Sequence, residues 1–295
     1  MSKIILLGGT GFLGKALLPM LQKENFQVIT LLHKNNSNSS TDTFSGDICD
    51  PGILDSKLDD GDIIVNLIGQ YEKNVSKFID NNILGAFNIL NSAVKKKNVK
   101  IIVISSISVY GENLKQQSKE SDVPNPYTNY GIVKFATEKI YRHFSLLHNI
   151  DITILRLSTL YGPFKKTGHI VNLIKSISNN TTTTAYNNGN QIRDLLFVND
   201  AANGIICTIN NFQKGFNILN ISSGKQYKIL DIIKIIEEIS KTKLSVKLSD
   251  KIPDERSLCA ENSLAKKEIG FIPKTSLEVG LRLTIEHFQT NTNIK

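Results

Sequence analysis

A chain of 295 residues, 40% hydrophobic and 21% charged, has the composition of a soluble globular protein that buries a substantial core. Its net charge is +8, but the lysines and arginines do not cluster and are not interleaved with aromatic residues, which argues against nucleic-acid binding. No apolar run is long enough for a signal peptide or a membrane span. Cys49, Cys207 and Cys259 lie far apart, without a CxxC pair or paired histidines, so we expect no metal site, no disulfide framework and a reduced, cytoplasmic setting.

The first half of the chain alternates between short β-rich runs and helical patterns. We expect strands at residues 3–7, 27–32, 44–45, 62–68, 100–105 and 151–157, and helices at 13–23, 75–96 and 130–148. This βαβα alternation is typical of an α/β fold in which helices cover both faces of a doubly wound parallel sheet.

After Gly162-Pro163 the pattern loosens. Residues 170–178 and 231–240 are expected to be helical, and residues 181–186 and 216–221 to be strands. We therefore expect one domain over residues 1–163 and a smaller C-terminal lobe built mainly from residues 164–295, with segments near 190–225 returning to the first domain.

A glycine-rich loop separates the first expected strand from the first expected helix. Gly9, Gly11 and Gly14 match the G-x-G-x-x-G pattern, and Gly8, Gly11 and Gly14 also follow each other at a spacing of three. Glycine permits the tight turn, the approach of the backbone to phosphates and the close packing of helix on strand. The amino end of the helix then offers N–H groups and positive dipole to a pyrophosphate. In this strand–loop–helix–strand setting the motif predicts a dinucleotide site. Its expected contacts are Gly8, Thr10, Gly11, Phe12, Leu13 and Gly14.

The end of the second strand bears on which dinucleotide is bound. An acidic side chain there binds the ribose hydroxyls of NAD, whereas a basic one suits the extra phosphate of NADP. The strand ends Leu31-Leu32-His33-Lys34 and has no carboxylate. We therefore expect His33 and Lys34 to contact the cofactor and favour NADP, with NAD as the alternative.

A serine, a tyrosine and a lysine form the candidate catalytic group. Ser106 ends a buried strand, and Tyr130 and Lys134, four residues apart, share one face of the expected helix. A phenol with a pKa of about 10 is a poor base at neutral pH, but a nearby ammonium and the nicotinamide charge stabilise the phenolate. Ser106 can then hold the substrate oxygen while Tyr130 transfers a proton.

The spacing of Tyr130 and Lys134 occurs a second time, at Tyr161 and Lys165. Pro163 lies between those two residues and interrupts a helix, so they are not expected to share a face. Tyr130 is therefore the catalytic candidate.

Taken in order, several blocks of the chain resemble the extended branch of the short-chain dehydrogenase/reductase superfamily, which contains nucleotide-sugar epimerases, dehydratases and reductases. They are the glycine loop, residues 46–50, residues 82–85, the Ser106, Tyr130 and Lys134 set, and residues 155–163, 189–200, 217–224 and 270–281. The resemblance implies a Rossmann-type fold with a smaller substrate-binding lobe and a catalytic dinucleotide domain.

The resemblance also implies further site residues. Asp47 would meet the adenine, and Arg193 and Arg256 would grip the diphosphate of a nucleotide sugar, because a guanidinium suits that geometry. Ile48, Leu67, Gly69, Asn82 and Ser105, together with Tyr130 and Lys134, would also contact the cofactor, and Ser108 and Thr159 the substrate. Members of this family commonly dimerise through the helices that correspond to residues 75–96 and 130–148, so we expect a homodimer. The charge pattern and the short apolar runs lead us to expect no nucleic-acid or membrane partner.

Departures from the family pattern narrow the reaction. Family dehydratases carry Asp-Glu where this chain has Ile107 and Ser108, which argues against a 4,6-dehydratase. Family epimerase-reductases pair a Cys, replaced here by Ser108, with a His near the position of His169. Thr159 replaces a substrate-binding Asn and Gly69 a usual Ala.

Three hypotheses remain. The one we favour, because the second strand ends without a carboxylate and the chain is rather short, is a reductase that transfers hydride from NADPH to the C4 keto group of a 4-keto-6-deoxy nucleotide sugar. The alternative is a nucleotide-sugar 4-epimerase, similar to UDP-glucose 4-epimerase, with tightly bound NAD. The third is a non-catalytic NADP sensor or scaffold, against which the intact Ser106, Tyr130 and Lys134 set argues.

Overall fold

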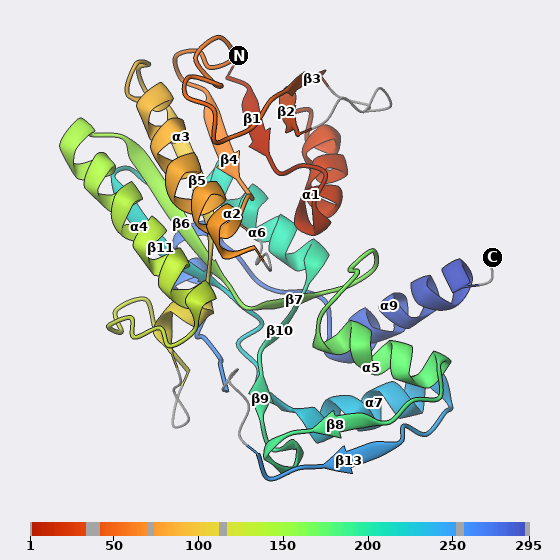
Figure 1. The fold of residues 1–295 in the computed structure, drawn as a ribbon. Helices are drawn as coiled ribbons and strands as arrows, with labels where there is room; N and C mark the ends of the chain where they lie inside the picture. Colours follow the sequence, from red (N-terminus) through yellow and green to blue (C-terminus); the bar gives the residue numbers. More distant parts are fainter. Residues whose placement is uncertain (1, 34–41, 70–73, 112–116, 252–256, 293–295) are drawn as a thin grey trace.

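The computed structural model describes residues 2–33, 42–69, 74–111, 117–251 and 257–292, and its centre is a seven-stranded parallel sheet (Figure 1). The strands lie in the order β3-β2-β1-β4-β5-β6-β11. They are β1 (Ile4–Leu7), β2 (Val28–Leu32), β3 (Asp42–Ser45), β4 (Ile63–Asn66), β5 (Lys100–Ser106), β6 (Asp151–Leu157) and β11 (Phe216–Ile221). The strand order reverses direction between β1 and β4, and ligands of such sheets bind outside the carboxyl ends of the strands at that point.

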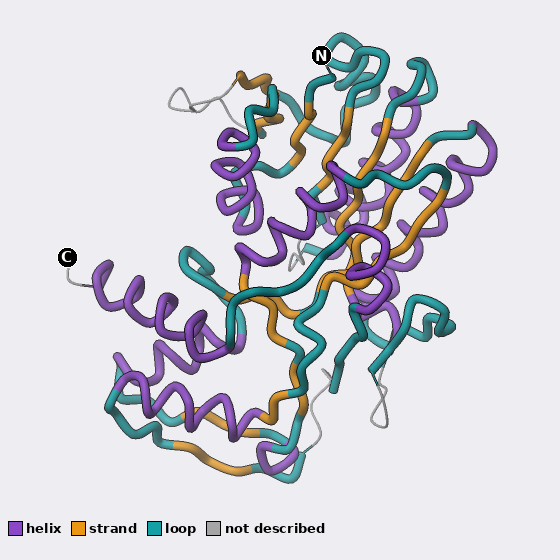
Figure 2. The backbone as a smooth tube through the Cα atoms, turned by 180° about the vertical axis from the view of Figure 1, so that it is seen from behind, coloured by secondary structure: helices purple, strands orange, loops and turns teal. Residues whose placement is uncertain are grey.

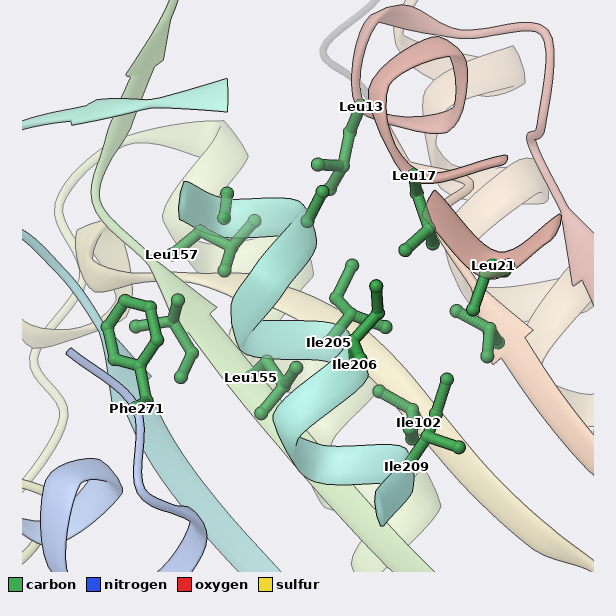
Figure 3. Close-up of a cluster of buried hydrophobic side chains, with 14 of the residues drawn as sticks. Leu13, Leu17, Leu21, Ile102, Leu155, Leu157, Ile205, Ile206, Ile209 and Phe271 are labelled. Atoms are coloured by element: carbon green, nitrogen blue, oxygen red, sulfur yellow. The ribbon is translucent and has the colours of Figure 1, made fainter. Parts of the chain in front are cut away.

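Both faces of the sheet are covered, which explains why its central strands β1, β2 and β4 are mostly apolar. In β1, Ile4 and Leu6 face one hydrophobic cluster, whereas Ile5 and Leu7 face the other. On the first face, α1 (Phe12–Lys23) and α6 (Val198–Asn210) pack against the strands and each other, with α8 (Ser263–Ile269) beside α6. Figure 3 shows this cluster, in which the α1 leucines Leu13, Leu17 and Leu21 meet Ile205, Ile206 and Ile209 of α6.

The second face carries α2 (Val75–Ile79), the π-helical segment η1 (Asp80–Leu84), α3 (Gly85–Ala93) and α4 (Asn129–His148). The sequence predicts one regular helix over residues 75–96, whereas the structure has a π-helical segment within it. Its cause is local: the buried Asn82 side chain donates from Nδ2 to the Phe78 carbonyl at 2.8 Å. That carbonyl would accept the Asn82 backbone N–H in a regular helix, and the competition widens the turn.

The smaller lobe lies beyond the carboxyl ends of the strands (Figure 2). Its core is formed by α5 (His169–Ser178), α7 (Ile229–Ser240) and α9 (Leu277–Thr292) together with pairs of short strands. The pairs are β7 (Thr159–Tyr161) with β10 (Leu195–Phe197), β9 (Ile192–Arg193) with β12 (Tyr227–Lys228), and β8 (Thr183–Ala185) with β13 (Val246–Leu248). The short 3-10 turns are η2 (Ile107–Tyr110) and η3 (Asn187–Gly189).

The parallel sheet, its two helical layers and the smaller lobe confirm the predicted Rossmann-type α/β fold. Within the described part of the chain, no helix is both long and apolar enough to cross a membrane.

Candidate active site

The glycine-rich loop joins the end of β1 to the start of α1. The Gly11 N–H donates to the Gly8 carbonyl at 3.0 Å, so the chain turns tightly just before the helix. A Cβ atom on Gly14 would come within 2.5 Å of backbone atoms of Gly8 and Gly9, so only glycine fits there. Thr10 and Gly11 are exposed, and α1 begins without a side-chain cap or an acidic residue in its first turn. The first amides of the helix are thus left for an anionic ligand.

His33 and Asp47 meet at the ends of β2 and β3. Nδ1 of His33 lies 3.5 Å from Oδ2 of Asp47, and the neighbouring Ile48 is buried. The sequence shows no carboxylate at the end of the second strand, but the fold brings one there from the third. His33 is therefore not part of a purely basic site, which weakens the argument for NADP. Lys34, the other basic candidate, lies outside the described residues.

The segment after β4 lies between the glycine loop and α4. The Leu67 N–H donates to the Leu7 carbonyl at 2.9 Å. Gly69 is buried, and a Cβ atom on it would collide with Oδ1 of Asn82 and Nζ of Lys134. Four residues that the resemblance assigned separately to the cofactor (Leu67, Gly69, Asn82 and Lys134) are thus neighbours in space.

Ser106, Tyr130 and Lys134 come together at the carboxyl end of β5. The Tyr130 hydroxyl is hydrogen-bonded to Ser106, and the Tyr130 ring stacks on Phe78 with centroids 5.8 Å apart. Nζ of Lys134 lies 6.0 Å from the centroid of the Tyr130 ring and donates to the Ile104 carbonyl at 3.1 Å. The structure therefore brings the three predicted residues into one cluster.

Burial sets the charge states of the tyrosine and the lysine. Burial raises the pKa of Tyr130 to about 12, and its hydrogen bond to Ser106 acts in the opposite direction. Burial lowers the pKa of Lys134 to about 8, partly offset by the charge of Glu138. At neutral pH the phenol is therefore neutral and the ammonium is charged, so Tyr130 can accept a proton only after it ionises, and the nearby ammonium favours that ionisation.

A buried ion pair behind the catalytic cluster was not anticipated from the sequence. Glu138, one helical turn after Lys134, accepts a hydrogen bond of 2.5 Å from the Ser105 hydroxyl and bonds of 3.0 and 2.7 Å from Arg156. Glu138 and Arg156 are 4% and 2% exposed. The Arg156 guanidinium also lies over the Tyr110 ring, 4.6 Å from its centroid. The ion pair thus anchors Ser105, the residue before Ser106.

The remaining substrate candidates lie on the side of the smaller lobe. The Ser108 hydroxyl oxygen is buried and has no hydrogen-bond partner in the described part of the chain. Thr159 is exposed at the start of β7, and its N–H donates to the Asp194 carbonyl at 3.0 Å. Arg193 is buried in β9, where Nη1 donates to the Ile192 carbonyl at 3.1 Å. Arg256 lies outside the described residues.

Two further polar residues, His169 and Asp194, lie near Arg193. Burial, reinforced by the charge of Arg193, lowers the pKa of His169 to about 4, so this imidazole is neutral at physiological pH. The Asp194 carboxylate is fully buried and accepts hydrogen bonds from the Ser223 N–H at 3.0 Å and the Ala260 N–H at 3.3 Å. Asp194 therefore fastens three segments around the arginine.

These observations fit a dinucleotide. The glycine loop excludes a side chain at Gly14, and the amino end of α1 has no side-chain cap. The Ser106, Tyr130 and Lys134 cluster, at the end of β5, lies on the other side of the reversal point between β1 and β4 from this loop. Leu13 is buried in the core and Phe12 packs against the same cluster, so both fix the position of the loop.

Comparisons with known proteins agree with this geometry. Residues 4–222 match the model of the NAD dependent epimerase/dehydratase family. The chain is 27% identical over 317 residues to the UDP-glucose 4-epimerase of Yersinia enterocolitica (93% of this chain, 94% of that one). It is 28% identical over 220 residues to the UDP-glucuronate 4-epimerase of Thermodesulfobacterium geofontis (74% and 68%). The structure of UDP-glucuronic acid 4-epimerase from Bacillus cereus with UDP-glucuronic acid and NAD superposes with a TM-score of 0.87 at 25% identity, covering 98% of this chain and 99% of that one.

Proposed function

This chain belongs to the NAD dependent epimerase/dehydratase family, and from that premise we propose that it is a 4-epimerase of UDP-sugars that works with bound NAD. It is an enzyme of the extended short-chain dehydrogenase/reductase type, so the hypothesis of a non-catalytic sensor falls away. The observation that carries the proposal is the assembled Ser106, Tyr130 and Lys134 cluster at the carboxyl end of β5, in a chain whose similar relatives include several 4-epimerases.

The sequence alone favoured an NADPH-dependent reductase, and the comparisons support the epimerase alternative better. Two arguments for the reductase lose their force. Asp47 beside His33 makes the end of β2 less suited to a second phosphate. The length of the chain also does not separate the two reactions, because the Bacillus cereus epimerase matches it almost end to end.

The proposed reaction assigns one task to each catalytic residue. When bound, the dinucleotide supplies reversible hydride transfer at C4 of the sugar. Tyr130, after losing its own proton to solvent, accepts the proton of the C4 hydroxyl as a phenolate while the keto group forms, and the resulting phenol gives the proton back in the return step. Ser106, hydrogen-bonded to Tyr130, orients the same oxygen. The Lys134 ammonium stabilises the phenolate form of Tyr130 that accepts this proton.

We assign the nucleotide diphosphate to the smaller lobe. Arg193 offers a guanidinium fork to the phosphates, and Asp194 holds the strand that carries it. Thr159, exposed at the entrance of β7, and Ser108 are placed on the sugar. His169, beside Arg193, is neutral at physiological pH, so the positive charge offered to the diphosphate here is that of Arg193.

The dimer expected from the family also remains a proposal. Leu84 and Phe87, at the end of η1 and in α3, are 42% and 38% exposed, and Leu147 on α4 is 63% exposed. Phe87 contacts Phe144 of α4 with ring centroids 6.0 Å apart, so the two helices present a joint apolar surface. We propose that two copies of the chain cover this surface in a four-helix bundle.

Interconversion of UDP-sugars without added cofactor tests the proposed function. The purified protein is incubated with UDP-glucose or UDP-glucuronate carrying deuterium at C4, and the products are separated and followed by NMR. We expect the C4 epimer to appear with its deuterium retained and NAD to be released when the protein is denatured. Stoichiometric oxidation of NADPH by a 4-keto-6-deoxy nucleotide sugar, with no interconversion, would instead establish the reductase.

A further inference from the structure

Lys165 belongs to the second Tyr-x-x-x-Lys spacing, which the proposed reaction does not use. The structure separates its two residues. Tyr161 is 1% exposed and packs in the core of the smaller lobe against Phe197, with ring centroids 5.6 Å apart. Lys165 turns toward the start of α1, where Nζ donates to the Leu160 carbonyl at 2.7 Å and lies 4.9 Å from the centroid of the Phe12 ring.

The charge of Lys165 is unbalanced. Among residues 2–33, 42–69, 74–111, 117–251 and 257–292, no carboxylate lies within ion-pair distance of its ammonium, whose partners are a carbonyl and an aromatic ring. Burial alone lowers its pKa to about 8, so the group is desolvated yet still charged at neutral pH. A desolvated ammonium without a counter-charge is costly, and an anion at this position would relieve that cost.

The position of Lys165 indicates which anion would bind beside it. Phe12 is the first residue of α1, directly after the glycine turn, and the connection between β7 and α5 passes close to this end of the helix (Figure 1). The α1 amides already favour an anion here, and an ammonium adds a full positive charge to the partial charge of the helix. The pyrophosphate of a dinucleotide carries two negative charges, which these two sources together match.

We propose that Lys165 binds the pyrophosphate of the dinucleotide, so that the smaller lobe contributes a charged group to a site otherwise built from the sheet. This proposal rests on the dinucleotide site of the proposed function. It has a consequence for an epimerase: the cofactor would bridge the two lobes and be released only when the β7–α5 connection moves away.

Binding of dinucleotide fragments to Lys165→Met tests the proposal. Isothermal titration calorimetry compares NAD, ADP-ribose, adenosine and UDP-glucose as ligands of the full chain from which bound NAD has been removed, and NAD retained through gel filtration is measured in parallel on untreated protein. Loss of a charge-assisted contact predicts that NAD and ADP-ribose bind about 10- to 100-fold more weakly, whereas adenosine, which has no phosphate, binds unchanged. The conservative Lys165→Arg should restore most of the affinity.

The neighbouring Lys166→Met is the matched control, because Lys166 is exposed and its variant should bind NAD like the unmodified protein. A thermal melt verifies that each variant folds. Unchanged NAD and ADP-ribose affinity in folded Lys165→Met would overturn the proposal, as would a loss confined to UDP-sugar, which would place Lys165 on the substrate. Failure of the unmodified chain to bind NAD would instead overturn the proposed function.

Discussion

Arg156 and Glu138 form an ion pair that is closed off from solvent behind the catalytic cluster, with Nη2 2.7 Å from Oε2. Burying two charges gains little net stability, but removing one partner leaves the other without compensation. The pair also fixes Ser105 through the 2.5 Å hydrogen bond from its hydroxyl. Its main role is therefore to keep β5, β6 and α4 in register at the site.

Replacement of Arg156 by Met should strongly destabilise the fold. The Glu138 carboxylate would remain buried without its counter-charge, so we expect the free energy of unfolding to fall by about 3–5 kcal/mol in urea titrations. Lys243→Met is the control, because it breaks an exposed pair with Glu237 in which Lys243 is 90% exposed. It should cost no more than about 1 kcal/mol. Equal losses for both variants would show that the buried pair has no special role.

The two Tyr-x-x-x-Lys copies should respond differently to removal of a hydroxyl. Tyr130→Phe keeps the ring that stacks on Phe78 but removes the proton-transfer group, so kcat should fall by about 10²- to 10⁴-fold while NAD stays bound. Tyr161→Phe changes only a residue in the core of the smaller lobe and should leave kcat within about threefold. Comparable losses of kcat from the two variants would contradict the assignment of Tyr130.

The rate of epimerisation should decline in mild alkali. Lys134 titrates before Tyr130 as the pH rises, because burial lowers the pKa of the lysine to about 8 and raises that of the tyrosine to about 12. Above pH 8 the neutral amine no longer stabilises the phenolate, so kcat should drop by up to tenfold per pH unit when measured at saturating UDP-sugar from about pH 6 to about pH 10.

Unfolding does not explain such a decline. A lysine whose pKa in the folded state lies below its ordinary value of 10.5 contributes rising stability between about pH 8 and pH 10.5, opposite in sign to the loss of rate. In Lys134→Met the residual rate should lack this descending limb. A rate that keeps rising to about pH 10 in the unmodified protein would show that the charge of Lys134 is not required.

The features that could be predicted from the sequence depend on residues that lie close together in the chain. Ile4 to Leu7 form one apolar run that serves both faces of the sheet, and the glycines after it have few alternatives to a turn before a helix. The four-residue spacing of Tyr130 and Lys134 likewise predicts a shared helical face without knowledge of the fold.

The features that could not be predicted depend on residues distant in sequence. Asp47 reaches His33 only because β3 lies beside β2, and this contact changes the argument about the cofactor. Glu138 gave a faint signal as a carboxylate one turn after Lys134, but its partner Arg156 lies on another element. The strands of the smaller lobe have only two or three residues, too few for a period to be visible, and they form because the lobe packs around them.

The apolar surface shared by α3 and α4 should hold two copies together. Leu147→Glu would place a charge on that surface, and we expect light scattering with size-exclusion chromatography to report a monomer where the unmodified protein is a dimer. Leu248→Glu is the control, because Leu248 is 54% exposed but lies on β13 of the smaller lobe. A dimer that survives the first variant, or a monomeric unmodified protein, would refute the proposed interface.

Gly69 tests how tightly the cofactor end of the site is built. Its φ is +119°, and a Cβ atom would collide with both Oδ1 of Asn82 and Nζ of Lys134. Gly69→Ala should therefore displace the lysine from Tyr130, lowering kcat at least about tenfold in addition to a strain of about 1–3 kcal/mol. Gly215→Ala is the matched control, because Gly215 also has a positive φ of +75° but no atom within 4 Å of its Cβ position. An alanine there also meets an unfavourable positive φ but does not touch the site, so it should lower stability and leave kcat unchanged. If kcat falls equally in both variants, backbone strain is the cause. If kcat falls only in Gly69→Ala, catalysis depends on the space that Gly69 leaves for the Lys134 side chain.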